Sequence, residues 1–290
     1  MKYRFSVLLI LCLWACKASD QVEEQVVYIK SAQGNFDIYQ SDVLGKWEQR
    51  LTTNPGFDWQ PNWNEAFGKM IYYSNDTSGN FSVLAKDLKT GDVDTLPMSH
   101  LPDFRLSPDG QHIFYTISDG AAKNIWKCDL DGNNRYQLTN TQGYNGRFSL
   151  STDGKKMAFI SDRTGTNQMY MMDLESRETE QISFFPLIAK YSSWSPDSQQ
   201  IAICLAEPSE DPNWDIWLYN LQDKGLEQFT NTPYSEQEIS WSLSGRKIAF
   251  HGTTENDGDQ IYTIDIADGK FTKITSGDFY HGEPAWVPVK

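Results

Sequence analysis

Short apolar runs separated by turn residues recur along the chain with a period of 42 to 47 residues. One copy, Ser192–Glu207, reads SSWSPDSQQIAICLAE, and an earlier one, Phe104–Asp119, reads FRLSPDGQHIFYTISD. Three kinds of position keep their phase over six copies, and the most regular is an apolar residue directly before a turn. It falls at Trp63, Leu106, Leu150, Trp194, Trp241 and Trp286. Such self-similarity indicates a repeat architecture.

Each copy contains four short runs rich in Ile, Val, Tyr, Phe and Trp, with no helical period between them. These runs are predicted β-strands, joined by turns of the Ser-Pro-Asp-Gly and Asp-Gly kinds. Four strands in each of six copies predict an all-β fold, a six-bladed β-propeller with four antiparallel strands per blade. The first copy begins with its second strand, Val26–Lys30, so we expect the C-terminal segment Glu283–Val289 to complete and close the first blade.

The turn and strand motifs resemble the repeat of TolB-type propellers, also called PD40. They stand here as Ser107-Pro108-Asp109-Gly110, Ser195-Pro196-Asp197, Ser161-Asp162-Arg163 and Leu138-Thr139. The resemblance covers residues 26–289 and implies the propeller fold, but its motif residues shape turns and imply little about function. TolB proteins of this family carry a separate N-terminal α/β domain as well. We expect this chain to match them in the propeller half only, so a role in the Tol system does not follow.

The first residues are typical of a bacterial lipoprotein signal. Lys2 and Arg4 precede an apolar run, Phe5–Trp14, which is too short to span a bilayer. The run ends in Leu13-Trp14-Ala15-Cys16, which resembles a lipobox, and this implies cleavage before Cys16 and lipidation of its thiol. We therefore predict a signal peptide at 1–15, a lipidated tether at 16–25 and the propeller at 26–290. Lys17 implies outer-membrane delivery, on the periplasmic or the surface side; a plain secretory signal is the alternative.

The chain is acidic, with a formal net charge of −14, and cleavage of Lys2 and Arg4 with the signal would make it −16. Such a charge repels phosphate backbones and anionic lipids. We therefore expect no nucleic-acid partner, contact with the membrane through the lipid anchor alone, and a monomer. Cys128 and Cys204 fall in different copies and form no C-x-x-C pair, so they are expected to be small buried hydrophobes.

A binding site is predicted at one mouth of the central channel. The residue three positions before each Trp or Leu marker is expected near that mouth, on the innermost strand of its blade. These residues are Gln60, Asp103, Arg147, Tyr191, Glu238 and Glu283. All are polar or amphipathic, whereas strand interiors elsewhere are apolar, so they are candidate ligand-binding residues. The alternative is that any water-filled channel has polar walls.

Metal binding is a further hypothesis. Asp103, Glu238 and Glu283 could supply oxygen ligands to Ca²⁺ or another divalent cation. A set of His251, His281 and Glu238 could hold zinc or manganese. The chain has only four histidines and no H-x-x-x-H spacing, so ordinary hydrogen-bonded histidines are the competing interpretation, and no other cofactor is expected.

No G-x-S-x-G, H-E-x-x-H, P-loop or G-x-G-x-x-G motif is present, so catalytic residues are not assigned and a non-enzyme is favoured. The leading hypothesis is a membrane-tethered binding or scaffold protein of the bacterial envelope that recognises a protein or peptide at the channel mouth. A carbohydrate-binding or lyase-like propeller is the alternative, and a structural part of an envelope complex is a third. Aromatic residues in or near loops would favour sugars; these are Trp59, Tyr144, Trp214, Tyr234 and Tyr280.

Overall fold

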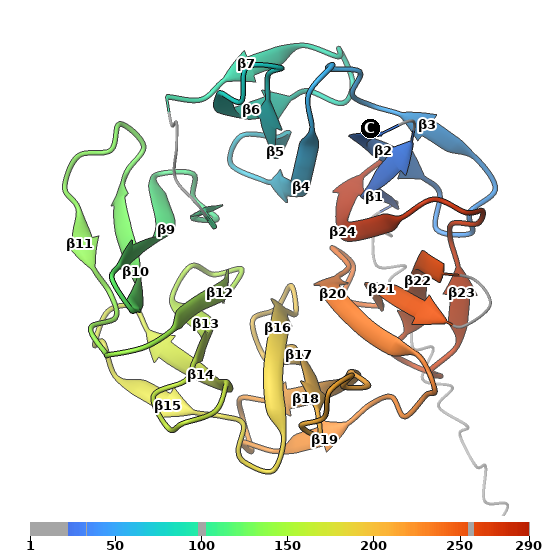
Figure 1. The fold of residues 1–290 in the computed structure, drawn as a ribbon. Coiled ribbons are helices and arrows are strands. Elements are labelled where there is room, and N and C mark those ends of the chain that lie inside the picture. The colour runs from blue at the N-terminus through green and yellow to red at the C-terminus, as the bar shows by residue number, and fades with distance from the viewer. Residues whose placement is uncertain (1–22, 33, 98–102, 255–257, 290) are drawn as a thin grey trace, which may run out of the picture.

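The computed structural model describes residues 23–32, 34–97, 103–254 and 258–289. Within them the chain forms 24 strands in six four-stranded antiparallel sheets, arranged as blades around a central axis (Figure 1). The predicted all-β, six-bladed propeller is confirmed. No helix among these residues is long and apolar enough to cross a membrane. The signal peptide and the lipidation site at Cys16 lie outside the described residues.

The strands of each blade are given from the axis outward. Blade one comprises β24 (His281–Pro288), β1 (Glu24–Ala32), β2 (Asn35–Ser41) and β3 (Glu48–Arg50). Blade two comprises β4 (Asp58–Asn64), β5 (Lys69–Asn75), β6 (Phe81–Lys86) and β7 (Val93–Thr95), and blade three β8 (Arg105–Leu106), β9 (His112–Asp119), β10 (Ala122–Asp129) and β11 (Tyr136–Gln137).

Blade four comprises β12 (Asn145–Leu150), β13 (Lys156–Ser161), β14 (Gln168–Asp173) and β15 (Thr179–Gln181). Blade five comprises β16 (Ile188–Trp194), β17 (Gln200–Ala206), β18 (Asp215–Asn220) and β19 (Leu226–Gln228). Blade six comprises β20 (Ser235–Trp241), β21 (Lys247–Thr254), β22 (Gly258–Asp265) and β23 (Phe271–Lys273).

The two ends of the chain close the ring, as predicted. Strand β24 pairs antiparallel with β1, so that Val26 lies opposite Trp286. Strand β1 begins at Glu24, two residues earlier than the sequence predicts, because Glu24 and Gln25 pair with Pro288 and Val287 although their side chains are polar. The Glu24 carboxylate also accepts bonds from the backbone N–H and hydroxyl of Ser244 in blade six. Residues 24 and 25 therefore belong to the propeller.

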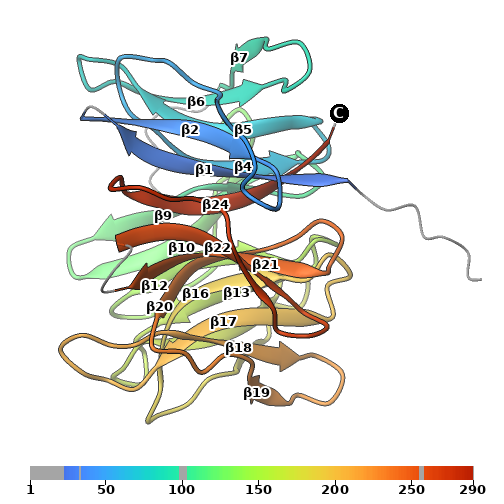
Figure 2. The ribbon, with the colours of Figure 1, turned by 90° about the vertical axis from the view of Figure 1, so that its right-hand side faces the viewer.

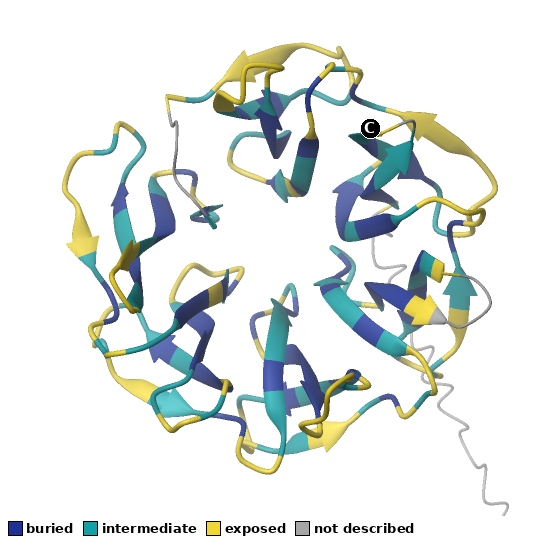
Figure 3. Cartoon of the chain, in the orientation of Figure 1, coloured by how far each residue is buried: buried dark blue, intermediate teal, exposed yellow. Residues whose placement is uncertain are grey.

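The hydrophobic core lies between the blades, and one buried cluster fills each of the six interfaces. In β17, Ile201, Ile203 and Leu205 face blade four, whereas Ala202, Cys204 and Ala206 face blade six. Side chains alternate between the faces of a sheet, so a strand covered on both faces is a continuous apolar run. Figure 3 shows the resulting burial of the inner strands beside the exposed outermost ones. Cys128 and Cys204 are free and buried, as predicted.

The Leu-Thr motif has a structural task. In blade four the Ser183 hydroxyl accepts the backbone N–H of Met169 at 2.8 Å and donates to the Gln168 side chain at 2.7 Å. Hydroxyls at the same place accept a backbone N–H of the third strand in four other blades; these are Thr52, Thr139, Thr230 and Thr275. The motif thus satisfies buried backbone donors where the fourth strand ends.

The propeller has two different faces, which follow from the antiparallel order. We call the face at which the innermost strands begin the entry face; the connections between blades run there. We call the other the hairpin face, because the Ser-Pro-Asp-Gly-like turns lie there. Strand β1 is the second strand of its blade, so it begins on the hairpin face, where the Val289 N–H donates to the Glu23 carbonyl at 2.8 Å. Figure 2 shows the start of β1 and the end of β24 on this one side.

Candidate functional site

The six sequence-predicted residues, which we call the mouth ring, occupy equivalent places near the entry-face start of the innermost strands. In blades two, four, five and six the pairing of the innermost strand shifts register across the ring residue. Every ring residue except Tyr191 has a positive φ, between 45° and 51°. A bulge with a left-handed residue bends a strand and re-aims its side chain, and such conformations cost about 1–3 kcal/mol for residues other than glycine. The strain is repeated at the channel mouth.

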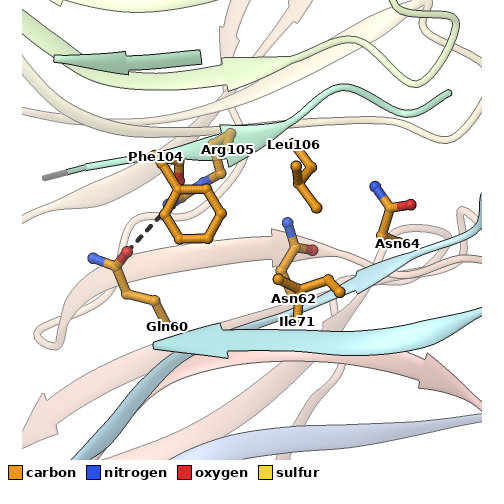
Figure 4. A pocket seen from close by; sticks show the side chains of 7 residues that line it. All are labelled: Gln60, Asn62, Asn64, Ile71, Phe104, Arg105 and Leu106. Carbon is orange, nitrogen blue, oxygen red and sulfur yellow. Dashed lines mark hydrogen bonds between the residues drawn. The ribbon is translucent and has the colours of Figure 1, made fainter. Parts of the chain in front are cut away.

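One half of the mouth ring is tied together by hydrogen bonds from blade to blade. The backbone N–H of Glu283 donates to Glu238 Oε2 at 2.8 Å, and that of Gln60 donates to Glu283 Oε2 at 2.6 Å. Gln60 Oε1 accepts from Arg105 Nη1 at 3.4 Å, as the dashed line in Figure 4 marks. We call Glu238, Glu283 and Gln60 the carboxylate arc. Its side chains stabilise the junctions of blades six, one, two and three.

The carboxylate arc is poorly solvated. Burial, together with the nearby Glu238, raises the pKa of Glu283 to about 7, although the Gln60 N–H opposes the shift. Burial and the Glu238, Glu283 and Asp259 carboxylates also raise the pKa of Tyr280 far above its ordinary value. Tyr280 fits here because Gly282 has no side chain; an added Cβ would lie 2.3 Å from the tyrosine hydroxyl.

The other half of the mouth ring opens into a cavity of about 500 Å³ over blades three, four and five. We call it the cationic pocket. Its charged side chains are Lys123, Arg147, Lys190 and Asp103, so three cations face one carboxylate. Its remaining lining is aromatic, aliphatic and amide, namely Tyr144, Trp214, Ile160, Ile188, Ala189 and Asn167. A locally positive cavity in a chain with a net charge of −14 was not predicted.

The cations of the pocket are held in place by neighbours. Lys123 Nζ pairs with Asp103 Oδ2. The Arg147 guanidinium lies over the Tyr191 ring, 4.8 Å from its centroid, and Lys190 Nζ lies 5.3 Å from that of Trp214. Lys190 also donates to the Gln237 side chain. Burial, followed by the nearby Arg147, lowers the pKa of Lys190, and burial raises that of Tyr191 to about 12.

The proposed metal sets find no geometric support. No group of three or more His, Cys, Asp or Glu within the described ranges is placed to hold a metal ion. His251 lies between two carboxylates, with Nδ1 3.8 Å from Glu238 Oε2 and Nε2 3.0 Å from Asp259 Oδ1. His281 is fully buried, and its Nδ1 lies 3.2 Å from the Asp259 carbonyl oxygen. Of the carboxylates considered for calcium, Asp103 pairs with Lys123, and the other two accept backbone N–H groups.

Figure 4 shows a second, much smaller cavity between β4 and β8, beside Gln60, Phe104 and Arg105. Its volume is about 20 Å³. That is enough for one water molecule, because a water needs at least about 10–15 Å³ of such volume. It is not a ligand site.

Sequence reasoning missed a row of buried polar residues, two positions before the mouth ring, although it singled out one member, His281, as a candidate metal ligand. Its members lie in four of the blades and are fully buried; they are Asp58, Asn145, Glu236 and His281. Glu236 accepts hydrogen bonds from the Thr232 hydroxyl at 2.8 Å, from the Ile216 N–H at 3.3 Å and from the Thr230 hydroxyl. These partners lie in β18 of blade five or in the connection from blade five to blade six. Burial raises the pKa of Glu236 to about 7. In these four blades the row joins a blade to the preceding one or to the connection from it, and its constant offset from the markers was the signal that could have found it.

Comparison with known proteins agrees with this architecture. Residues 82–185 match the family model described as TolB beta propeller domain. The chain is 26% identical over 211 residues to the uncharacterized peptidase YuxL of Bacillus subtilis, covering 70% of this chain and 30% of the relative. It is 24% identical over 271 residues to the Tol-Pal system protein TolB of Francisella tularensis subsp. mediasiatica, covering 88% and 58%. It thus spans less than two thirds of either relative.

Among solved structures, TolB from Acinetobacter baumannii superposes with a TM-score of 0.75 at 22% identity, covering 92% of this chain and 67% of that one. An oligogalacturonate lyase in complex with manganese superposes with a TM-score of 0.58 at 12% identity, covering 87% and 74%. These structural likenesses concern the fold. With the family match and the six four-stranded blades, they identify the chain as a TolB-like six-bladed β-propeller.

Proposed function

We propose that this propeller is a non-catalytic binding module of the bacterial envelope, tethered through a lipid on Cys16, that holds a protein or peptide segment at its entry face. The observation that carries the proposal is that exposed aromatic side chains gather on that face, mostly in the connections between blades. The TolB name of relatives covering 88% of the chain, and the signal-like first residues, support an envelope location.

Half of the exposed large hydrophobic residues among the described residues lie on the entry face, and all of these are aromatic: Phe57, Phe81, Phe184, Phe185, Tyr234 and Phe279. Apart from Phe81, they lie in the connections that lead from an outermost strand to the next innermost strand. The exposed hydrophobics of the hairpin face lie on or next to outermost strands, away from the axis, except Val289, which follows the innermost strand β24. Exposed aromatics beside a cavity are typical of protein-binding surfaces.

The position of the tether supports the same face. Glu23, where the described chain begins, lies on the hairpin face, and Cys16 is seven residues before it. A lipid on Cys16 would bring the hairpin face toward the bilayer, because seven residues span at most about 25 Å. The entry face would then point away from the membrane and be free to meet a partner.

A capture experiment from detergent-solubilised envelopes of the native organism tests this proposal. The purified chain is compared with the double variants Phe184→Ser/Phe185→Ser, on the entry face, and Leu44→Ser/Tyr136→Ser, on the hairpin face. Each pair removes two side chains that are more than half exposed, so we expect both variants to fold, although Tyr136 also contacts the Arg177 guanidinium. We expect one dominant protein with the wild type and the hairpin-face variant, and at least about a tenfold loss with the entry-face variant. Equal capture by all three would contradict the proposal.

A carbohydrate ligand is the second candidate, and one observation favours it. The net negative charge argued against an acidic sugar, but the cationic pocket is locally positive and has Tyr144 and Trp214 in its lining. His251 and His281 lie in blades six and one and are not part of that lining. The pocket would therefore bind such a sugar without a histidine to act on it.

A further inference from the structure

We propose that the cationic pocket recognises an acidic peptide segment, with Arg147 and Lys190 contacting its carboxylates and Phe184 and Phe185 contacting an adjacent apolar side chain. This inference rests on the proposed function and specifies its ligand. It also assigns the binding site to blades three, four and five, rather than to the whole mouth ring.

The charge of the pocket favours an anionic ligand. Lys123 and Asp103 pair with each other and offset their charges. Neither Arg147 nor Lys190 forms a salt bridge with a carboxylate in the described part of the chain. Arg147 lies over the Tyr191 ring, and Lys190 contacts aromatic rings and the neutral Gln237 side chain, with Glu238 of the next blade near enough to oppose the lowering of its pKa. Two positive charges thus remain without a salt bridge in this cavity, although the chain as a whole is acidic. Such charges attract anionic groups.

The partial burial of Lys190 also favours an anionic ligand. Lys190 is half-buried against Trp214 and Tyr191, and burial lowers its pKa. Holding a cation away from water costs free energy unless a partner compensates it. Arg147 is exposed on the same wall and presents its planar guanidinium, which suits two-point contact with a carboxylate. A bound carboxylate would compensate both cations together.

Two exposed phenylalanines lie in the connection at the edge of the pocket, which we call the rim. Phe184 is 60% and Phe185 74% exposed, in the connection that leads into β16. The Gln168 side chain donates to the Leu187 carbonyl at 2.8 Å, and the Ala189 N–H to the Asn167 carbonyl at 2.9 Å. Because Asn167 and Ala189 both line the pocket, these bonds hold the connection at its edge. An anionic site bordered by an exposed phenylalanine pair suits a peptide with acidic and apolar residues.

The carboxylate arc argues against a uniformly anionic polymer. Glu238 and Glu283 lie in blades six and one, which follow the cationic pocket around the same mouth, and would repel a polyanion that extended from the pocket over those blades. A peptide can place its acidic residues over blades three to five and neutral residues over the arc. Charge alternation around the mouth therefore favours an acidic peptide segment over a long acidic sugar.

The test measures binding of fluorescent peptide pools to the purified full-length chain by anisotropy. One pool combines Asp and Glu with Phe, Trp and Leu in random order, and the matched pool replaces Asp and Glu by Asn and Gln. The proteins are the wild type, Arg147→Gln/Lys190→Gln, and a control, Lys46→Gln/Lys155→Gln, which removes the same charge from exposed positions on the hairpin face. Oligogalacturonate is a separate probe.

We expect the acidic pool to bind the wild type and the control at least about tenfold more tightly than the Arg147→Gln/Lys190→Gln variant, and the difference to shrink as salt is added. Equal binding of both pools, or of all three proteins, would overturn the inference. So would oligogalacturonate binding that needs Arg147 and Lys190 when the acidic pool does not bind. Capture that depends on Phe184 and Phe185 but not on Arg147 and Lys190 would leave the proposed function standing while this inference fails.

Discussion

A chain that ends at Gly282 is expected to lose its folded state. Removal of residues 283–290 deletes nearly all of β24, the innermost strand of blade one, including Trp286 and Val287, which are 2% and 0% exposed. It also deletes the hydrogen bond of 3.0 Å from Trp286 Nε1 to the Ser240 carbonyl of blade six. Lost burial of these side chains and an opened β1 edge together cost more than about 5 kcal/mol, which is comparable to the whole stability of a domain.

The measurement is the soluble yield and the thermal midpoint of the truncated chain, followed by circular dichroism. Removal of residues 289–290 alone is the control, because it leaves all of β24 in place and, among the described residues, deletes only Val289, which is 41% exposed and whose N–H donates to the Glu23 carbonyl. We expect an unchanged midpoint for the control and an aggregated or unfolded product for the longer truncation. A soluble protein with the wild-type midpoint would show that the closing strand is dispensable.

Raising the pH from 4.5 to 8 is expected to destabilise the protein through Glu236. Burial raises the pKa of this fully buried carboxyl from the ordinary value of 4.5 to about 7, so the folded state binds more protons than the unfolded state in that range. Stability therefore falls as the pH rises from 4.5 through 7 and is level above it. A shift of this size corresponds to about 3 kcal/mol. Glu283 acts in the same direction.

The measurement is the free energy of unfolding by urea across this pH range for the wild type, Glu236→Gln, and Glu227→Gln on the exposed strand β19. Burial lowers the pKa of His281, which acts in the opposite direction below its ordinary value of 6.5. The difference between wild type and Glu236→Gln removes that contribution. We expect this difference to change by about 3 kcal/mol, and the Glu227→Gln curve to parallel the wild type. A pH-independent difference would contradict the assignment of a buried, neutral Glu236.

The repeat predicts the propeller because its markers occupy equivalent positions in successive blades. Trp194 and Trp286 donate from Nε1 to carbonyls of the preceding blade, and the Leu-Thr hydroxyls satisfy buried N–H groups. The phase of the markers also located the mouth ring, because a bulge recurs at that place. What the phase could not predict was the start of β1, since Glu24 and Gln25 have no apolar alternation.

The division of the mouth into a cationic pocket and a carboxylate arc could not be predicted from the sequence either. Lys190 is one residue before the ring position and Lys123 lies on a third strand, so neither repeats from blade to blade. Lys123, Arg147 and Lys190 line one cavity only because side chains from three different blades extend into it. Conversely, Glu238 and Glu283 were predicted as ligand-binding residues, yet both accept backbone N–H groups of the next blade. Their substitution would thus affect the closure of the ring as well as any ligand.

Site-specific photo-crosslinking in cells of the native organism tests the central claim, that the entry face is the binding surface. A photoreactive amino acid replaces Phe185 at the rim of the cationic pocket or, in a second strain, Tyr136 on the hairpin face; both positions are exposed, at 74% and 53%. We predict one dominant crosslinked protein for position 185 and none for position 136. The same product from position 136, or no product from position 185, would contradict the account.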